Sequence, residues 1–372
     1  LEEHQKATEY NLEKIFFSKF VRSFRLIVLL LWTIGGGLSA LSYYIIKSDE
    51  SFSQIGIFFI SYLLIETILS IPASYYSTFV IEQKYGFNKT TKKTFIVDIL
   101  KSILLSIVIG LPLFLFILYL LEVMGESWWL YSWVAFVIFQ LLLVFIYPKF
   151  IAPIFNKFSE ITDDSLVEEI KILLNKTNFN AKGLFKMDAS KRSSHGNAYF
   201  TGFGKNKRIV FFDTLLNQMN TKEILAILAH ELGHFKKKHV LKSMIFAFLM
   251  MILMFFILSK AISSSAFLEG HGLQTNSSAV SIILFMMILP VYTFLITPIG
   301  NIISRKNEFA ADNFACHHTS SEDLQSALLK LYKFNYGALC PDEIYSNFYD
   351  SHPPALIRIK NLKKNIKKKT HE

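Results

Sequence analysis

Long apolar runs separated by short charged loops are the dominant pattern along the chain. Several of these runs approach the roughly 20 residues that an α-helix needs to cross the hydrocarbon core of a bilayer. The pattern predicts six membrane spans, at residues 26–46, 55–80, 99–121, 128–147, 243–262 and 280–303. We therefore expect a mostly α-helical, polytopic membrane protein.

The longest polar segment lies between the fourth and fifth spans, at residues 148–242. Cap-type residues followed by helical apolar spacing predict a helix at 162–177. Strands are expected at 183–188, 197–203 and 208–216, the last two joined by a hairpin turn at 204–207. Asn220, followed three residues later by Glu223, has the pattern of a capping box and predicts a helix that runs to residue 239.

The distribution of charge orients the spans. The chain carries a net charge of +10, and its basic residues cluster in the segments 1–25 and 81–98. The loops at 47–54, 122–127 and 263–279 hold only one basic residue, Lys47. By the positive-inside rule, the amino-terminal segment, the 148–242 segment and the tail face the cytoplasm, at an endoplasmic reticulum membrane or a bacterial inner membrane. The basic residues form no patch interleaved with aromatic residues, so nucleic acid is not a predicted partner.

The motif AHELGH carries the clearest chemistry. His230 and His234 are four residues apart, so both imidazoles leave the same face of the predicted helix and can hold one cation. Glu231 is suited to accept a proton from an attacking water molecule. Cys316 and Cys340 are the only cysteines, which excludes a disulfide framework and a cysteine zinc site.

A catalytic zinc ion commonly takes three protein ligands, so one more is expected. His239 lies five residues after His234 and does not fit the metzincin spacing. Glu308 fits better, because it follows the sixth span by a length similar to that by which His234 precedes the fifth. At about 1.5 Å per helical residue, both lie about 13–15 Å beyond the same bilayer edge. Asp312, one helical turn after Glu308, can accept the free N–H of a zinc-bound histidine.

These features resemble the integral-membrane zinc metalloproteases of the CAAX prenyl protease type 1 family. The resemblance covers nearly the whole chain and includes EQKYGFNKTT, YPKFIAPIFNKF, SKRSSHGNAYFTGFGKNKRIVFFDTLL, AHELGHFKKKH, EFAAD and SHPPALIR. It implies one Zn²⁺ per chain, held by His230, His234 and Glu308, with Glu231 as the general base and Asp312 behind the ligands. It also implies hydrolysis of peptide bonds near the C-terminus of prenylated (farnesylated) proteins or similar peptides.

The same resemblance assigns three further residues near the zinc. His352 is expected to donate a hydrogen bond to the oxyanion of the tetrahedral intermediate. Asn197 and Arg358 are expected to support this donor and the substrate. His352 precedes Pro353 and Pro354, which favour a rigid, non-helical turn suited to holding a donor still.

The strand that follows Gly196 is the expected substrate-binding edge. The residues GNAYFTG resemble the edge strand on which peptides pair in this family, an arrangement that exposes the scissile amide. Gly196, Asn197, Ala198 and Tyr199 are therefore predicted to bind substrate. Core packing is the favoured role for the aromatic rings of Tyr199 and Phe200.

The fold implied by the resemblance is a barrel of seven membrane helices around a water-filled chamber, capped by a gluzincin-like zinc protease domain with a small β-sheet. A seventh span is expected before residue 1, which is Leu rather than Met. Glu66, Asp98, Lys101 and Gln140 are expected to face the chamber or a membrane interface. The expected segments are a membrane region at 1–147, a cytoplasmic protease segment at 148–242, a pair of spans at 243–303 and a cytoplasmic helical segment at 304–372.

Two alternatives stay open on the sequence alone. One is a membrane quality-control metalloprotease of the HtpX type, although that group is shorter and has fewer spans. The other is a transporter or lipid-binding membrane protein with a structural zinc, although such sites commonly use four protein ligands. The expected partners are a peptide or prenylated protein substrate and membrane lipid, and the chain is expected to be a monomer.

Overall fold

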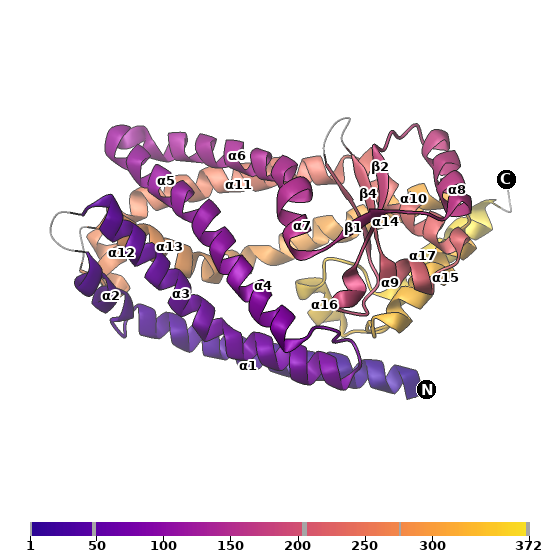
Figure 1. Ribbon diagram of the computed structural model, residues 1–372, viewed down its shortest axis with the longest axis horizontal. Helices are drawn as coiled ribbons and strands as arrows, with labels where there is room; N and C mark the ends of the chain where they lie inside the picture. Colours follow the sequence, from indigo (N-terminus) through magenta and orange to yellow (C-terminus); the bar gives the residue numbers. More distant parts are fainter. Residues whose placement is uncertain (1, 47–49, 203–206, 275–276, 370–372) are drawn as a thin grey trace.

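The computed structural model describes residues 2–46, 50–202, 207–274 and 277–369. The molecule is elongated, with long helices along its length and a small sheet with shorter helices at one end (Figure 1). The start of α1 (Glu2–Trp32) and the end of α17 (Ala355–Lys369) both lie toward the sheet end.

Within the described residues, five helical segments are long and apolar enough to cross a bilayer, and there are six if one bent pair counts as a single span. The bent pair is α1 and α2 (Gly37–Ile45), which meet at 49°. The other five segments are built from α3 (Phe52–Tyr76), α4 (Lys92–Leu105), α5 (Leu111–Val123), α6 (Trp128–Ile146), α7 (Ala152–Phe155), α11 (His239–Ala261), α13 (Ser278–Thr293) and α14 (Thr297–His318). All six predicted spans overlap these segments, and the predicted fold class is confirmed. A span before residue 1 lies outside the described residues and stays a prediction.

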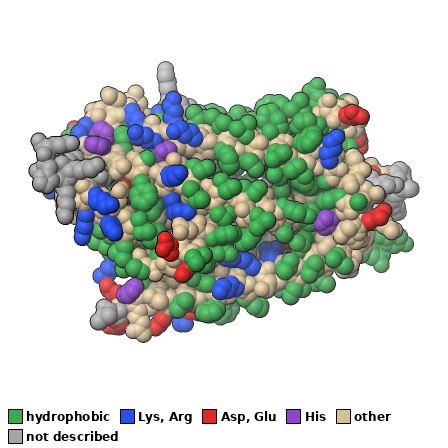
Figure 2. Space-filling view, turned by 180° about the vertical axis from the view of Figure 1, so that it is seen from behind, with side chains coloured by type: hydrophobic (Ala, Val, Ile, Leu, Met, Phe, Trp, Pro, Cys, Tyr) green, Lys and Arg blue, Asp and Glu red, His purple; other side chains and the backbone are tan. Residues whose placement is uncertain are grey.

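The surface of the long helices is suited to lipid. Apolar side chains cover most of it, whereas Lys and Arg gather mainly toward the end that carries the sheet (Figure 2). Leu31, Ile57, Leu100 and Leu249 are each more than half exposed. Because acyl chains cover such side chains at no hydrophobic cost, this surface indicates a bilayer around the helices and water at the sheet end.

The water-facing end contains a four-stranded sheet with the strand order β1-β2-β4-β3. The strands are β1 (Phe158–Glu160), β2 (Gly183–Met187), β3 (Ala198–Thr201) and β4 (Arg208–Phe212). β1 pairs antiparallel with β2, β2 pairs parallel with β4, and β3 pairs antiparallel with β4, with Ala198 opposite Phe211. β3 has a neighbouring strand on one side only, so within the described sheet its other edge is open to an added strand.

Helices cover the sheet and join it to the membrane segments. They are α8 (Asp164–Lys176), α9 (Asp213–Gln218), α10 (Thr221–Lys236), α15 (Ser321–Phe334), α16 (Glu343–Tyr349) and, at the far end of the molecule, α12 (Ser265–Gly270). One apolar core joins α8, α10, α15 and β4 and includes the buried residues Ile170, Phe211, Leu228 and Leu324. A second core, which includes Trp32, Phe58, Phe114 and Leu284, lies among the membrane helices.

The strand expected at 208–216 is wrong in its second half. β4 ends at Phe212, and α9 begins at Asp213. The Asp213 carboxylate accepts hydrogen bonds from the backbone N–H groups of Thr214 (2.8 Å) and Ser190 (2.9 Å), and an acid in the first turn favours a helix over continued strand. The helix at 162–177 and the strand at 183–188 are confirmed as α8 and β2. The short strand β1 was not predicted, and most of the hairpin turn at 204–207 lies outside the described residues.

Charged groups in the membrane segments contact protein groups. Glu66 accepts hydrogen bonds from Nη1 of Arg25 and Nε1 of Trp32, both at 2.7 Å. It borders a cavity of about 610 Å³ between α1, α3 and α13. Nζ of Lys101 donates to the carbonyl oxygen of Ile154 at 2.7 Å. These contacts reduce the cost of placing charge at membrane depth.

A capping box begins α10, as the sequence predicts. Oδ1 of Asn220 accepts from the N–H of Glu223 at 3.0 Å, and Oε2 of Glu223 accepts from the N–H of Asn220 at 2.9 Å. The buried Glu223 carboxylate also accepts from Oγ of Ser326 and Nζ of Lys330, both at 2.7 Å. One carboxylate therefore fixes the start of α10 and joins it to α15.

Replacing Glu223 by Ala should lower the free energy of unfolding by about 1–3 kcal/mol, because it removes the cap and leaves buried donors without an acceptor. Denaturant or thermal unfolding of the detergent-solubilised chain measures the loss. The control is Glu168→Ala at an exposed site on α8, which should change stability by less than about 0.5 kcal/mol. An equal loss in both variants would contradict this role for Glu223.

Candidate metal centre

α10 brings two histidines together at its carboxyl end. His230 and His234 lie one helical turn apart, and their Nε2 atoms are 3.1 Å from each other. His230 is buried and His234 is partly buried. The opposite face of α10 packs into the apolar core through Ile224 and Leu228, which fixes the direction in which the imidazoles point.

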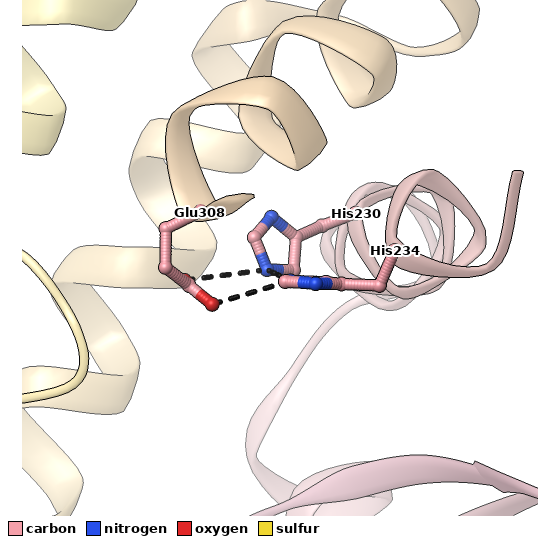
Figure 3. Close-up of side chains that lie close together, drawn as sticks. All are labelled: His230, His234 and Glu308. Carbon is pink, nitrogen blue, oxygen red and sulfur yellow. Dashed lines mark hydrogen bonds and ion pairs between the residues drawn. The ribbon is translucent and has the colours of Figure 1, made fainter. Parts of the chain in front are cut away.

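Glu308 reaches the same point from α14. Its Oε1 atom lies 3.2 Å from Nε2 of His234, and its Oε2 atom lies 3.6 Å from Nε2 of His230 (Figure 3). α14 continues from α13 through the short 3₁₀ turn Phe294–Ile296, so one helical path leads from the bilayer to this carboxylate. Of the described residues, only these three form such a group, with one ligand atom each within 4.8 Å of the others.

A glycine allows α10 and α14 to approach closely. A Cβ atom on Gly233 would lie 2.9 Å from the Cα atom and 3.0 Å from the carbonyl oxygen of Ala311. Ala311 itself is fully buried. Contacts of this length are shorter than van der Waals packing permits, so only glycine fits between the two histidines at this separation.

Asp312 and Arg358 lie behind the histidines. Oδ1 of Asp312 is 2.8 Å from Nδ1 of His230, and Arg358 donates to both oxygens of Asp312, at 2.9 and 2.6 Å. Nη1 of Arg358 is also 3.1 Å from Oε2 of Glu308. Burial lowers the pKa of Arg358, but the hydrogen bonds and negative charge of Asp312 outweigh burial and raise it overall. A permanently charged guanidinium therefore holds Asp312 against His230, which keeps the proton of His230 on Nδ1.

His239 makes the corresponding contact to His234, and the sequence analysis missed it. Nδ1 of His239 lies 3.1 Å from Nδ1 of His234. Lys238, which has a left-handed φ of 56°, turns the chain between α10 and α11 and brings the buried His239 back toward α10. If Nδ1 of His234 donates to Nδ1 of His239, the lone pair on Nε2 of His234 is directed at the cluster. The five-residue spacing was tested only for a direct ligand, not for a residue behind one.

Glu231 and His352 lie at the same cavity as the histidines. Burial raises the pKa of Glu231 above the usual carboxylic range, despite the charges of His230 and His234. The exposed His352 places Nε2 3.4 Å from Oε1 of Glu308. It precedes α17 in a non-helical turn, as predicted, and the hydroxyl of Tyr332 donates to the carbonyl oxygen of Pro353 in that turn at 3.3 Å.

The open edge of β3 borders the cavity, which has a volume of about 620 Å³. Gly196, Asn197 and Ala198 line it together with the histidines. The carbonyl of Asn197 accepts from the N–H of Phe212 at 2.9 Å. Because successive residues of an antiparallel strand point to opposite sides, Ala198 directs its backbone groups to the open edge. The N–H of Ala198 donates to Oδ1 of Asn197 at 2.8 Å.

The side chain of Tyr199 points away from the cavity. It packs against Met187 and Phe212, as the core role predicts. Among the residues predicted to bind substrate, the structure thus brings Gly196, Asn197 and Ala198 to the cavity and leaves the ring of Tyr199 in the core.

The donor set fits Zn²⁺. The separations of 3.1, 3.2 and 3.6 Å are close to the roughly 3.3 Å between tetrahedral ligands that lie 2.0–2.1 Å from the ion. Oε2 of Glu308 is buried and, among the described residues, accepts no hydrogen bond. Two neutral imidazoles and a carboxylate leave a fourth position for water or substrate, as catalytic zinc sites do.

Comparison with known proteins was consistent across sequence families and structures. One family model, described as CAAX prenyl protease N-terminal, five membrane helices, matches residues 1–157, and another, described as peptidase family M48, matches residues 160–366. The probable CAAX prenyl protease 1 of Schizosaccharomyces pombe is 34% identical and is matched over 97% of this chain and 81% of its own length. The CAAX prenyl protease 1 homolog of Arabidopsis thaliana is 39% identical over 79% of this chain and 70% of its own length.

The fold is also similar to a solved structure. The crystal structure of S. mikatae Ste24p matches 97% of this chain and 89% of its own, with a TM-score of 0.91 and 32% sequence identity. At this level the arrangement of elements and much of the sequence are shared.

Replacing Gly233 by Ala should weaken zinc affinity by about tenfold or more, because the added methyl group must push α10 away from Ala311 and displace the ligands. Competition with a chromophoric chelator measures the affinity. Gly300→Ala is the matched control on α14, since no atom lies within 4 Å of the added Cβ. Unchanged affinity in Gly233→Ala would show that this close contact does not set the ligand geometry.

Replacing His239 by Ala should lower zinc affinity by about 10- to 100-fold, the usual effect of removing the partner of a metal-bound histidine. The same competition measurement applies, with the exposed His317→Ala on α14 as control. If both variants bind zinc as tightly as the unmodified chain, the contact between His239 and His234 has no role in holding the metal.

Proposed function

The chain belongs to the CAAX prenyl protease type 1 family of M48 peptidases and is a multi-pass membrane metalloendopeptidase, and from this premise we propose that it hydrolyses peptide bonds near the C-terminus of prenylated proteins with the help of one Zn²⁺. One observation carries the proposal: two histidines and a buried glutamate converge beside a potential general base, in a cavity bordered by an open strand edge.

His230, His234 and Glu308 would hold the zinc ion. When bound, Zn²⁺ supplies a Lewis acid that polarises the scissile carbonyl and lowers the pKa of water. The donor set supports this choice, because two imidazoles and one carboxylate suit zinc better than magnesium or calcium, which prefer oxygen ligands.

Glu231 is the proposed general base. Its raised pKa suits a group that takes a proton from water and later delivers it to the leaving amine. His352 would donate to the oxyanion as negative charge develops on the carbonyl oxygen. The contact of Arg358 with Asp312 and Glu308 supports a role for Arg358 in fixing the ligands rather than in proton transfer.

The substrate would lie extended along β3. Its backbone would pair with Ala198, with Gly196 and Asn197 supporting the segment on either side of the scissile bond. The printed names of the relatives, CAAX prenyl proteases, support a prenylated C-terminal segment as the substrate. A lipid-modified chain end partitions to the membrane surface, and the cavity lies where α10 and α14 leave the membrane helices.

The charge pattern supports an active site on the cytoplasmic side, of an endoplasmic reticulum membrane or a bacterial inner membrane. We further propose that the chain works as a monomer and divides at about residues 147, 242 and 303, as the sequence analysis predicts. The HtpX-type alternative is less well supported, because the N-terminal family model of the prenyl proteases matches residues 1–157. A transporter with structural zinc is excluded by the peptidase family match.

Replacing Glu231 by Gln should reduce cleavage of a farnesylated CAAX peptide by at least about 10²-fold, because the amide cannot accept the proton, while zinc content stays near one per chain. Peptide cleavage followed by mass spectrometry and metal analysis together check this. The exposed Glu168→Gln on α8 is the control. A fully active Glu231→Gln enzyme overturns the assignment, and an unmodified enzyme that cleaves an unprenylated peptide equally well overturns the proposed substrate.

A further inference from the structure

A buried polar cluster lies beside the substrate edge and has no part in the chemistry described above. Its centre is His195, which directly precedes Gly196. Nε2 of His195 lies 3.2 Å from Oε2 of Glu82, and Nδ1 lies 3.2 Å from Oδ1 of Asn335. The imidazole also stacks on the ring of Phe87, with centroids 4.2 Å apart.

The amide of Asn335 has a defined orientation. Its Oδ1 accepts from the N–H of Gly196 at 3.1 Å, and its Nδ2 donates to the carbonyl oxygen of Gly196 at 3.4 Å. A flipped amide would place donors against the Gly196 N–H. Oδ1 of Asn335 therefore faces Nδ1 of His195 as an acceptor.

The other side of His195 also faces an acceptor. Glu82, at the end of the π-helical turn Ser77–Glu82, accepts from the hydroxyl of Tyr10 at 2.6 Å through Oε1, and Nζ of Lys14 lies 3.6 Å from the same oxygen. Oε2 of Glu82 is thus directed at His195. Because imidazole is a stronger base than carboxylate, a proton shared between them resides on the histidine.

Both ring nitrogens of His195 therefore require a hydrogen atom. Only the doubly protonated imidazolium donates to Glu82 and Asn335 at once, whereas the neutral ring leaves one nitrogen lone pair against an acceptor. The titratable groups on the elements packed around His195 are Tyr10 and Lys14 of α1, Glu82 itself, and Tyr85 and Tyr336, whose rings contact Phe87 and Tyr10.

The cluster is directly connected to the substrate edge. Asn335 grips both backbone groups of Gly196, and the hydroxyl of Thr214 fixes the carbonyl of His195 at 2.8 Å. The next two residues, Asn197 and Ala198, line the cavity. A change at His195 therefore moves the backbone that would pair with substrate, without touching the metal ligands.

We propose that His195, in its imidazolium form, is a positioning residue that holds the Gly196–Ala198 segment in register for substrate pairing by donating to Glu82 and Asn335 together. The proposal rests on the proposed function, because it needs a peptide bound along β3. His195 acts through Asn335 and Gly196, so it affects the affinity for peptide rather than the rate of the bond-breaking step.

The proposal predicts a direction for the pH dependence of binding. Histidine is the side chain that ordinarily loses its charge between pH 5 and 8. When His195 loses its proton, one of its two hydrogen bonds is replaced by a contact between two acceptors. Peptide affinity should then fall by about two- to tenfold from pH 6 to pH 8.5, the equivalent of one lost hydrogen bond.

Glu82→Gln tests this sharply. The Gln amide can keep its oxygen on the hydroxyl of Tyr10 and donate an N–H to Nε2 of the neutral His195, whose Nδ1–H then donates to Asn335. The variant therefore satisfies the cluster with uncharged His195 and should lose the fall in affinity at high pH. Glu13→Gln is the matched control on α1: Glu13 accepts from Lys84 and Tyr85, away from His195, so this variant should keep the unmodified profile.

Asn335→Asp should act in the opposite direction. A carboxylate at this position adds negative charge beside His195, holds its proton to higher pH and shifts the fall in affinity upward in pH. This second variant decides the question if Glu82→Gln does not fold, and circular dichroism and zinc content check the folding of each.

The measurement is the dissociation constant of a fluorescent farnesylated CAAX peptide, determined by anisotropy from pH 6 to 8.5 on the full-length chain in detergent. Every protein carries Glu231→Gln, so that binding is read without cleavage and any titration of the metal ligands is common to all. A flattened profile for Glu82→Gln together with an upward shift for Asn335→Asp supports the proposal. Profiles identical to that of Glu13→Gln overturn it.

A separate measurement with Glu231 restored distinguishes the two levels of inference. His195→Gln should raise KM about two- to tenfold and leave kcat within about twofold, since its single amide cannot donate to both acceptors. Equal losses in kcat and kcat/KM would overturn the positioning role. An unmodified chain that neither binds nor cleaves the farnesylated peptide refutes the proposed function itself, a result distinct from unchanged pH profiles in a chain that does bind.

Discussion

The close packing of α10 against α14 at Gly233 and Ala311 is the contact on which the site depends. The spacing within α10 sets only the distance between His230 and His234, whereas the position of Glu308 depends on how near the second helix lies. The missing side chain of Gly233 permits a backbone approach that a methyl group would block, since its Cβ would lie 2.9 Å from Ala311. Three donor atoms from two helices can therefore meet within bonding reach of one cation.

The membrane helices set where along their length the two helices meet. α10 leads into α11, and α13 leads into α14, so the ligands lie on extensions of two membrane segments (Figure 1). Bilayer thickness limits how far each segment can slide, because moving polar residues into lipid is costly. The left-handed residue Lys238 breaks the path from α10 to α11 and thereby turns His239 back onto His234. The junction between membrane and water thus also supplies a contact that supports the metal site.

The segment that leads to the open strand edge is held from the membrane side as well. Arg192 donates to both oxygens of Asp98 on α4, at 2.8 and 3.0 Å, and Asn88 and Ser193 form a β-bridge. His195 then contacts Glu82 at the end of the second predicted span. These contacts explain why the loop EQKYGFNKTT and the segment SKRSSHGN, far apart in the chain, carry specific polar residues. They tie β3 to the same helices that position the zinc ligands, and a peptide on β3 is held at a fixed distance from the metal only if both are rigid.

The sequence by itself determined the features that are local and periodic: the membrane segments, from the length of the apolar runs; the capping box that begins α10; and the pairing of His230 with His234. It also indicated Glu308, because bilayer thickness acts as a ruler that is readable from the chain. Only the tertiary structure decided which residues lie behind the ligands and beside the strand, such as His239, and Glu82 and Asn335 around His195. The latter contacts join residues 113 and 140 positions apart, and no spacing rule relates such residues. Their meeting depends on how helices pack across the whole molecule, and that packing is the sum of many weak contacts that no single motif encodes.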